Sequence, residues 1–222
     1  MSEQTLQIGR HTLQLLPERA VYWPALSALL LADLHLGKAA AFRRAGLAIP
    51  EGDTAASLQR LDALITNWQP REIILLGDIL HVRLGSDPAL HRQILDWRVR
   101  HGAITMTAII GNHDRELRRL EPALDCYEEG IERSGVVLRH HPPEGGIDRP
   151  WIAGHWHPVV RLDAGGDSLR LPAFIQESGD GLILPAFGGM TGGAPVTARR
   201  GRSRYVTSGE AVLAVDAYQP AD

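Results

Sequence analysis

Cysteine is almost absent from this 222-residue sequence, in which Cys126 stands alone. A single cysteine excludes an internal disulfide framework and a cysteine-rich zinc site, so we interpret Cys126 as a small core residue. Lysine is equally scarce. Lys38 is the only one, and arginine supplies the remaining basic charge, which we attribute to a biased genome composition.

The sequence also lacks a strong positive charge and a membrane-length apolar run. Its formal net charge is -3 and its pI is about 6.4, so no global field draws it to nucleic acid. The apolar stretch at residues 25–32 is too short to span a bilayer, and the polar N-terminus shows no signal-peptide pattern. We therefore expect a soluble cytoplasmic protein. Because 44% of the residues are hydrophobic and no linker is visible, we expect a single domain over residues 1–222.

Short apolar runs alternate with helical patterns in the first two thirds of the chain. Strands are predicted over residues 27–35, 72–78 and 103–110, and helices over 53–68, 86–102 and from about Arg115 to before Pro122. This β-α-β-α-β order predicts an α/β fold in which helices cover a sheet. After residue 134, further apolar runs, glycines and prolines predict strands and loops with little helix.

The two long predicted helices have clear signals. The first places apolar side chains on one face: Leu58, Leu61, Leu64, Ile65 and Trp68. Asp53 or Thr54 can cap its start, and Pro70 lies just beyond its end. The second has capping residues and a proline near its first turn, and Gly102 after its last turn.

Side chains that bind metals and protons recur at the ends of five predicted strands. In chain order they are Asp33 and His35, then Asp78, then Asn112, His113 and Asp114, then His140 and His141, and finally His155 and His157. In open α/β sheets, ligands bind beyond the carboxyl ends of the strands. Five such ends can therefore bring their side chains to one place.

The set of donors favours two metal ions over one. It contains more candidate ligands than a tetrahedral zinc site uses, and it consists of imidazoles, carboxylates and an amide without a thiolate. Manganese, iron, nickel and zinc suit such ligands. A bridging carboxylate would hold two ions roughly 3.5–4 Å apart, the spacing used in hydrolytic phosphoryl transfer.

Each of these motifs, taken singly, has an ordinary structural explanation. Gly77, Gly111 and Gly154 can be turn glycines. Asn112 can cap the following helix, with Asp114 favouring the positive end of that helix. The recurrence of such residues after five apolar strands is what indicates a metal site.

The same residues resemble the signature of the calcineurin-like metallophosphoesterase superfamily. The matching blocks are D-L-H at residues 33–35, G-D at 77–78, G-N-H-D at 111–114, a histidine after the next strand, and G-H-W-H at 154–157. The resemblance implies an α/β four-layer sandwich, in which two mixed β-sheets are flanked by α-helices. It also implies a binuclear metal site at the strand ends.

The resemblance further implies a role for each residue. One metal ion would be bound by Asp33, His35 and His157, the other by Asn112, His140 and His155, and Asp78 would bridge the two. His113 would act on the leaving group or on a phosphate oxygen, and Asp114 would orient His113. His140 fits the superfamily pattern better than His141. Since adjacent strand residues point to opposite faces, we expect only one of the two to bind the ion, with His141 near the substrate.

A narrower resemblance concerns residues 32–54, 77–83 and 184–193. These segments are similar to the bacterial ligase-associated DNA damage response endonuclease subfamily. The resemblance implies a phosphodiesterase that uses two divalent ions, with Mn²⁺ preferred, and that acts on DNA during repair. It also implies a functional association with DNA ligase and helicase repair proteins.

Several residues can contact a phosphate next to the metals: His81, Lys38, Arg43, Arg44 and His141. For His81, a polar helix-start or surface position is an equal explanation, as is a solvated helix face for Arg43 and Arg44. The basic run at residues 198–204 can touch a nucleic-acid backbone or form an exposed loop, and the loop is the preferred interpretation. For Trp151 and Trp156, we prefer packing to base stacking.

The sequence thus predicts a binuclear metal-dependent phosphodiesterase, a DNA endonuclease of DNA repair, in which a metal-activated hydroxide attacks phosphorus. A phosphomonoesterase or a nucleotide pyrophosphatase on the same fold is the nearest alternative, because the fold does not determine the substrate. A non-catalytic scaffold of this fold is an alternative from another class.

Overall fold

The first β-sheet comes from residues 4–127 of the chain. The computed structural model describes residues 4–82, 87–114, 116–120, 124–145, 147–164, 166–178 and 180–216. The sheet contains, in order, β1 (Gln4–Ile8), β2 (His11–Leu16), β3 (Ala20–Trp23), β4 (Ala28–Leu31), β5 (Glu72–Leu76), β6 (Thr105–Ile109) and β7 (Asp125–Tyr127). Strands β1 to β4 pair antiparallel and β4 to β7 pair parallel, so the sheet is mixed.

The second β-sheet comes from the remainder of the chain. Its strands are β8 (Ile131–Arg133), β9 (Val136–Arg139), β10 (Trp151–Ala153), β11 (Pro158–Ala164), β12 (Asp167–Glu177), β13 (Gly181–Ile183), β14 (Ala194–Pro195), β15 (Arg202–Thr207) and β16 (Val212–Ala214). Strand β10 runs parallel to β9 and β13, whereas β12 runs antiparallel to β11, β13 and β15. The predicted α/β fold with two mixed sheets is confirmed.

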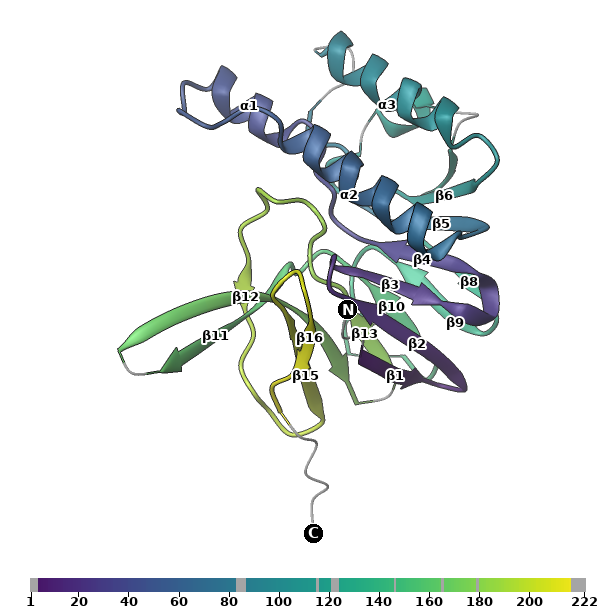
Figure 1. Cartoon of the computed structure of the whole chain (residues 1–222). Helices are drawn as coiled ribbons and strands as arrows, with labels where there is room; N and C mark the ends of the chain where they lie inside the picture. Colours follow the sequence, from purple (N-terminus) through teal and green to yellow (C-terminus); the bar gives the residue numbers. More distant parts are fainter. Residues whose placement is uncertain are drawn as a thin grey trace.

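The described α-helices and one 3-10 helix lie together over the first sheet (Figure 1). They are α1 (Lys38–Arg44), α2 (Asp53–Trp68), α3 (Pro88–Arg100) and the 3-10 helix η3 (Leu117–Leu120). The 3-10 helix η1 (Pro24–Leu26) instead connects β3 to β4, and its Leu26 packs into the cluster between the two sheets. Within the described ranges, none of these helices covers the outer face of the second sheet. That face carries its own apolar cluster, which includes Trp151, Ile175 and Val206.

The central strands of the first sheet, β4, β5 and β6, are buried on both faces. On one face Leu29 and Ile73 pack with Leu61 of α2 and Ile94 of α3. On the other face, alternate residues such as Leu30 pack against the second sheet in a separate cluster. A strand buried on both sides must be apolar throughout, which is why the strand predictions at residues 27–35, 72–78 and 103–110 succeeded.

Helix α2 has the predicted bounds, but its start differs from the prediction. Its N-cap is Gly52, and neither Asp53 nor Thr54 caps the helix. Asp53 lies in the first turn, and the Thr54 hydroxyl accepts a hydrogen bond from the N–H of Gly37 at 3.0 Å. The predicted caps were wrong because a tertiary contact engages Thr54.

Helix α3 begins as its sequence predicts. Asp87 is the N-cap, its side chain accepts a hydrogen bond from the N–H of Leu90 at 3.0 Å, and Pro88 follows. The short helix predicted after β6 is the 3-10 helix η3, and its predicted limits Arg115 and Pro122 lie outside the described residues. Among the described helices, none has the length and apolar character needed to cross a membrane.

Candidate metal centre

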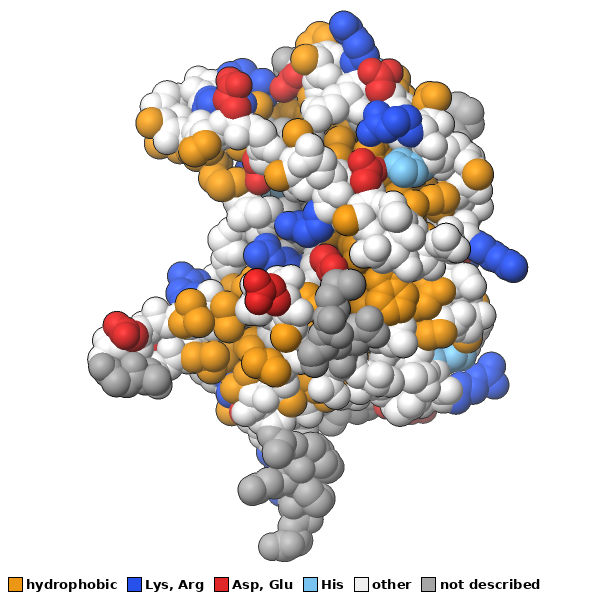
Figure 2. Space-filling model, viewed as in Figure 1, with side chains coloured by type: hydrophobic (Ala, Val, Ile, Leu, Met, Phe, Trp, Pro, Cys, Tyr) orange, Lys and Arg blue, Asp and Glu red, His pale blue; other side chains and the backbone are white. Residues whose placement is uncertain are grey.

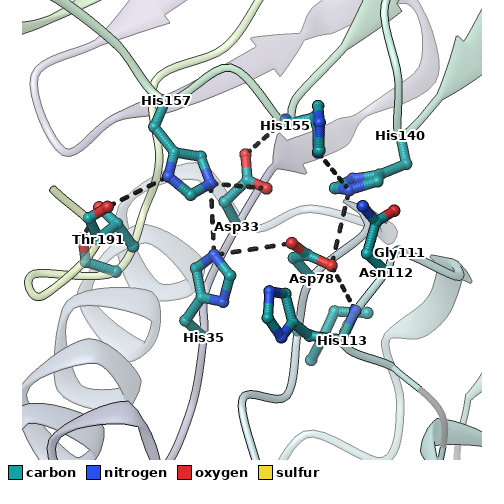
Figure 3. A network of polar contacts seen from close by, with 12 residues as sticks. Asp33, His35, Asp78, Gly111, Asn112, His113, His140, His155, His157 and Thr191 are labelled. Atoms are coloured by element: carbon teal, nitrogen blue, oxygen red, sulfur yellow. Dashed lines mark hydrogen bonds and ion pairs between the residues drawn. The ribbon is translucent and has the colours of Figure 1, made fainter. Parts of the chain in front are cut away.

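The five predicted strand ends converge where the two sheets meet. Residues after β4, β5 and β6 of the first sheet approach those after β9 and β10 of the second (Figure 3). Backbone hydrogen bonds tie the ends together: the N–H of Asp33 donates to Gly77, and that of Gly154 donates to His140. The parallel pairing of β4, β5 and β6 brings their carboxyl ends to one edge.

A first group of donors consists of Asp33, His35, Asp78 and His157. One ligand atom from each lies within 4.8 Å of the others. The Nε2 atoms of His35 and His157 are 3.3 Å apart, and His157 Nε2 is 3.2 Å from Asp33 Oδ1. Two imidazole nitrogens at this distance require a proton or a cation between them.

A second group of donors consists of His140, His141 and His155, whose ligand atoms also lie within 4.8 Å of one another. His155 Nδ1 is 3.1 Å from His140 Nε2. Asp78 connects the two groups. Its Oδ2 lies 3.8 Å from His35 Nε2 and its Oδ1 lies 3.6 Å from His140 Nε2. The carboxylate therefore stands where a bridging ligand would.

Burial and charge in the centre fit cations. Asp33 and Asp78 are 0% and 3% exposed, and Asp33 Oδ1 receives no hydrogen bond of good geometry within the described residues. Burial, helped by the nearby Lys38 charge, lowers the pKa of His35 to about 2, so His35 keeps a lone pair at neutral pH. Burial opposes protonation of His157, yet contacts with Asp33 and the Thr191 carbonyl raise its pKa. Paired carboxylates with neutral imidazoles are a donor set for divalent metals.

Backbone carbonyls fix the orientation of two imidazoles. His140 Nδ1 donates to the carbonyl of Leu76 at 2.8 Å, and His157 Nδ1 donates to that of Thr191 at 3.2 Å. In the neutral form of each imidazole, this bond places the lone pair on Nε2, which is directed into the centre, as hydrogen bonds behind metal-binding histidines generally do. Sequence reasoning missed Thr191. The only signal was the glycine-rich stretch at residues 187–193, because a backbone carbonyl has no residue preference.

The three motif glycines leave no room for a side chain. A Cβ at Gly77 would lie 2.3 Å from His140 Nδ1, and one at Gly111 would lie 2.3 Å from Asp78 Oδ1. A Cβ at Gly154 would lie 2.8 Å from Asp33 Oδ2. Each glycine thus packs against a donor from a neighbouring strand. Only Gly77 also has a positive φ, of 86°, so a turn alone does not explain the three.

Asp114 connects two of the strand ends. Its carboxylate accepts hydrogen bonds from the N–H groups of Ile79, Leu80 and Gly111 at 2.8, 2.8 and 2.9 Å. Burial raises the pKa of Asp114 to about 6 despite these bonds. In the part of the chain that the structure describes, both carboxylate oxygens thus bond to backbone rather than to the His113 ring. Asp114 organises the loop after Asp78.

Asn112 and His113 take up separate positions. Asn112 Oδ1 accepts a hydrogen bond from His141 Nε2 at 2.7 Å, whereas η3 begins only at Leu117, so Asn112 is not its cap. The N–H of His113 donates to Asp78 Oδ1 at 2.9 Å. Its imidazole stacks on that of His81, with centroids 5.0 Å apart and planes inclined by 29°. The nitrogens of His35, His81 and His113 form a third compact group.

The argument that His140 and His141 point to opposite faces was wrong. Strand β9 ends at Arg139, so both histidines lie beyond it and strand alternation does not apply to them. Their ring centroids are 4.7 Å apart, and the His141 ring lies 4.0 Å from that of His155. His140 is buried and His141 is exposed, so His140 faces the interior of the centre and His141 its rim.

The residues expected to contact substrate divide into two sets. His81 joins the centre through His113 and His35, and burial lowers its pKa. Lys38 is half-buried at the start of α1, and the charges of Asp78 and Asp33 act on it. By contrast, Arg43 donates to the Pro50 carbonyl at 2.9 Å, and Arg44 pairs with Asp87 at 3.0 Å. These two guanidinium groups bond to the protein itself.

Three of the four arginines in the basic run at residues 198–204 form ion pairs. Arg199 and Arg202 both pair with Glu177, and Arg204 pairs with Asp216.

The two tryptophans beside the last histidine block differ in exposure. Trp151 is 6% exposed, as packing requires, but Trp156 is 40% exposed. The packing expectation for Trp156 was wrong, because its neighbours His155 and His157 turn inward and leave it at the surface.

Comparisons with known proteins agree with this geometry. The family described as calcineurin-like phosphoesterase matches residues 26–213. The chain therefore belongs to that family, whose members use divalent metals. Among solved structures, the nuclease MPE of Pseudomonas putida has a TM-score of 0.80 and 34% identity, over 96% of this chain and 100% of that one. Yfce, a phosphoesterase from E. coli, has a TM-score of 0.44 and 13% identity, over 80% and 86%. No curated protein sequence matches the chain.

Proposed function

We propose that this phosphoesterase is a two-metal phosphodiesterase that cuts nucleic acid, with DNA as its preferred substrate. The observation that carries the proposal is the position of Asp78, whose two oxygens face two separate groups of donors. The likeness to a Pseudomonas putida nuclease over nearly the whole chain supports the choice of substrate.

Two divalent ions fit the donors that the strand ends supply. In the proposal one ion is held by Asp33, His35 and His157, the other by Asn112, His140 and His155, and Asp78 bridges them. Mn²⁺ is the proposed metal, and Fe, Ni or Zn would also suit this set. Such a pair of ions, when bound, activates water and neutralises charge on phosphate oxygens.

The remaining residues of the centre have proposed roles of their own. His113 stands beside the donors rather than among the first group, and its imidazole would give a proton to the departing oxygen. Asp114 would hold the loops that carry Asp78 and Asn112 at the right separation. The Asn112 amide and the Lys38 ammonium would hold the phosphate oxygens.

The proposed biological setting is DNA repair in the cytoplasm, in functional association with DNA ligase and helicase proteins. This setting rests on the subfamily resemblance of residues 32–54, 77–83 and 184–193. Deleting the gene and measuring survival after DNA damage tests it. Wild-type survival after every class of damage would contradict the proposal.

A metal-by-substrate grid tests the biochemical proposal. Purified protein is assayed with each divalent metal on single-stranded DNA, on bis(p-nitrophenyl) phosphate and on p-nitrophenyl phosphate. We expect manganese-stimulated hydrolysis of DNA and of the diester. A preference for the monoester would exclude the nuclease. Protein purified without chelators that holds no metal pair would indicate a scaffold. Full activity in folded Asp78→Ala would contradict the two-metal proposal.

A further inference from the structure

A pocket of about 290 Å³ adjoins the metal centre on the side of His157. The residues that line it include Arg19, His157, Arg170, Thr191, Gly192 and Gly193. We propose that this pocket binds the backbone phosphate next to the one being cut, so that the two arginines position a nucleic-acid strand across the metals. The proposal rests on the proposed function and deepens it.

The pocket borders the metal centre at His157. This residue belongs to both, since its Nε2 lies 3.2 Å from Asp33 Oδ1 and it is one of the residues that line the pocket. Figure 2 shows a hollow between the helices above and the β11–β12 hairpin below, with basic side chains along its wall. In the proposal, a strand whose scissile phosphate lies on the metals places its neighbouring phosphate in the pocket.

The charge of the pocket is uncompensated. Within the described ranges, the Arg19 side chain forms no ion pair, and its single hydrogen bond is a long one, 3.4 Å to the carbonyl of Gly188. Arg170, from β12, donates to the Gly193 carbonyl at 2.9 Å and likewise has no carboxylate partner among the described residues. By contrast, Arg199 and Arg202 share Glu177. Two arginines left without carboxylates in a cavity are suited to a phosphate.

The surroundings of Arg19 add to this argument. Burial lowers the pKa of Arg19, and no acidic side chain offsets that effect. The nearby carboxylates of Glu18 and Asp53 act instead on Arg60, which lies over the Phe187 ring at 4.0 Å. A half-buried guanidinium without a counter-charge is costly, and an anionic ligand would offset the cost.

The glycine-rich loop shapes the pocket so that a phosphate can approach its backbone. A Cβ at Gly193 would lie 2.2 Å from a methyl carbon of Val159, and Gly192 has a φ of 64°. Thr191 joins this loop to the metal centre through its carbonyl bond to His157. The loop thus contributes both to orienting a histidine and to forming the phosphate pocket.

The test compares Arg19→Gln and Arg170→Gln with a matched surface variant, Arg149→Gln. Arg149 is exposed and pairs with Glu132 at 2.9 Å, so it controls for a lost surface charge. Binding of a short fluorescein-labelled single-stranded DNA is measured by anisotropy, with the full-length protein kept in EDTA to prevent cutting. Each pocket variant should weaken DNA binding about tenfold. In a plot of the logarithm of the association constant against the logarithm of the salt concentration, its slope should be less steep by about 0.7. Arg149→Gln should match the wild type.

Kinetics of the manganese-loaded protein give a second measurement. For DNA, the pocket variants should raise KM more than they lower kcat. Bis(p-nitrophenyl) phosphate has no neighbouring phosphate, so its kcat/KM should fall much less than that of DNA. Arg19→Lys, which keeps the charge, should recover much of the DNA affinity.

Two results would overturn the proposal that this pocket binds a backbone phosphate of the nucleic acid. One is DNA affinity and KM in both pocket variants equal to those of Arg149→Gln. The other is a thermal shift with inorganic phosphate that disappears in Arg19→Gln while DNA binding is unchanged, which would assign the pocket to free phosphate. A wild type that binds DNA through both arginines but never cuts it would contradict only the nuclease proposal.

Discussion

Asp78 Oδ1 lies 3.6 Å from His140 Nε2, so a carboxylate from the end of β5 meets an imidazole from beyond β9. The two residues follow strands of different sheets. The candidate metal centre therefore exists only where the sheets pack together. Its donors depend on that packing as much as on their own identities.

Removing the charge of Asp78 should abolish metal binding and activity. Asp78→Asn keeps the shape of the side chain but replaces the carboxylate that faces both donor groups. We expect loss of both metal equivalents and a fall in phosphodiesterase kcat/KM of about a hundredfold or more. Metal analysis by mass spectrometry and a diester assay measure these changes. Asp163→Asn, an exposed residue paired with Arg161, is the control and should change neither. Retention of both metals by Asp78→Asn would disprove the bridging role.

Variants of His113 and Asn112 should distinguish a loss of catalytic rate from a loss of metal binding. His113→Ala should retain two metals and lose rate, because a general acid contributes about a hundredfold or more. The loss should be larger on DNA than on bis(p-nitrophenyl) phosphate, whose leaving group needs no proton. Asn112→Ala should also weaken metal binding. Equal losses on both substrates in His113→Ala would argue against a proton-donating role.

Gly111 should be intolerant of even one added methyl group. In Gly111→Ala the Cβ would lie 2.3 Å from both the backbone nitrogen and Oδ1 of Asp78, which must move. We expect metal affinity to fall by about tenfold to a hundredfold while the fold is retained. Isothermal titration with Mn²⁺ and circular dichroism measure the two effects. Gly102→Ala is the matched control, since its Cβ would lie 3.4 Å from the nearest atom, the Val99 carbonyl oxygen. Wild-type affinity in Gly111→Ala would show that the close packing is unimportant.

Metal removal should lower thermal stability. An ion that binds only the folded state stabilises it by about 2.7 kcal/mol at a hundredfold excess over Kd. For a chain of this size, that corresponds to a drop in Tm of about 5–10 °C when EDTA replaces excess Mn²⁺. Differential scanning fluorimetry measures this drop in Tm. In Asp33→Asn, the drop in Tm on replacing Mn²⁺ with EDTA should be smaller than in the wild type. An unchanged Tm in EDTA would contradict a metal centre built into the junction of the sheets.

Residue type and order were sufficient to predict which side chains lie together at the strand ends. Asp33, Asp78 and His155 each follow a run of apolar residues, which is the pattern of a strand buried on both faces. The bounds of α2 were predictable for a similar reason, because its apolar residues repeat at helical spacing.

Other features involve partners that are distant in the sequence. From the sequence, the basic run at residues 198–204 could contact nucleic acid or form an exposed loop. The structure shows that its arginines pair with Glu177 and Asp216, which are distant in the sequence. The relative orientation of His140 and His141 was predicted wrongly, because the end of β9 at Arg139 is set by strand pairing and not by residue type.

The sequence by itself determined the chemical nature of the centre, since imidazoles and carboxylates after five apolar strands can be recognised without coordinates. Only the tertiary structure decided how those groups are oriented and what lies beside them. The carbonyl of Thr191 that orients His157 is a backbone group and has no sequence signature. Arg19 and Arg170 are 151 positions apart and meet in one pocket only because β12 and the turn after β2 pack around the same loop. Such placement depends on long-range packing, which local sequence patterns do not encode.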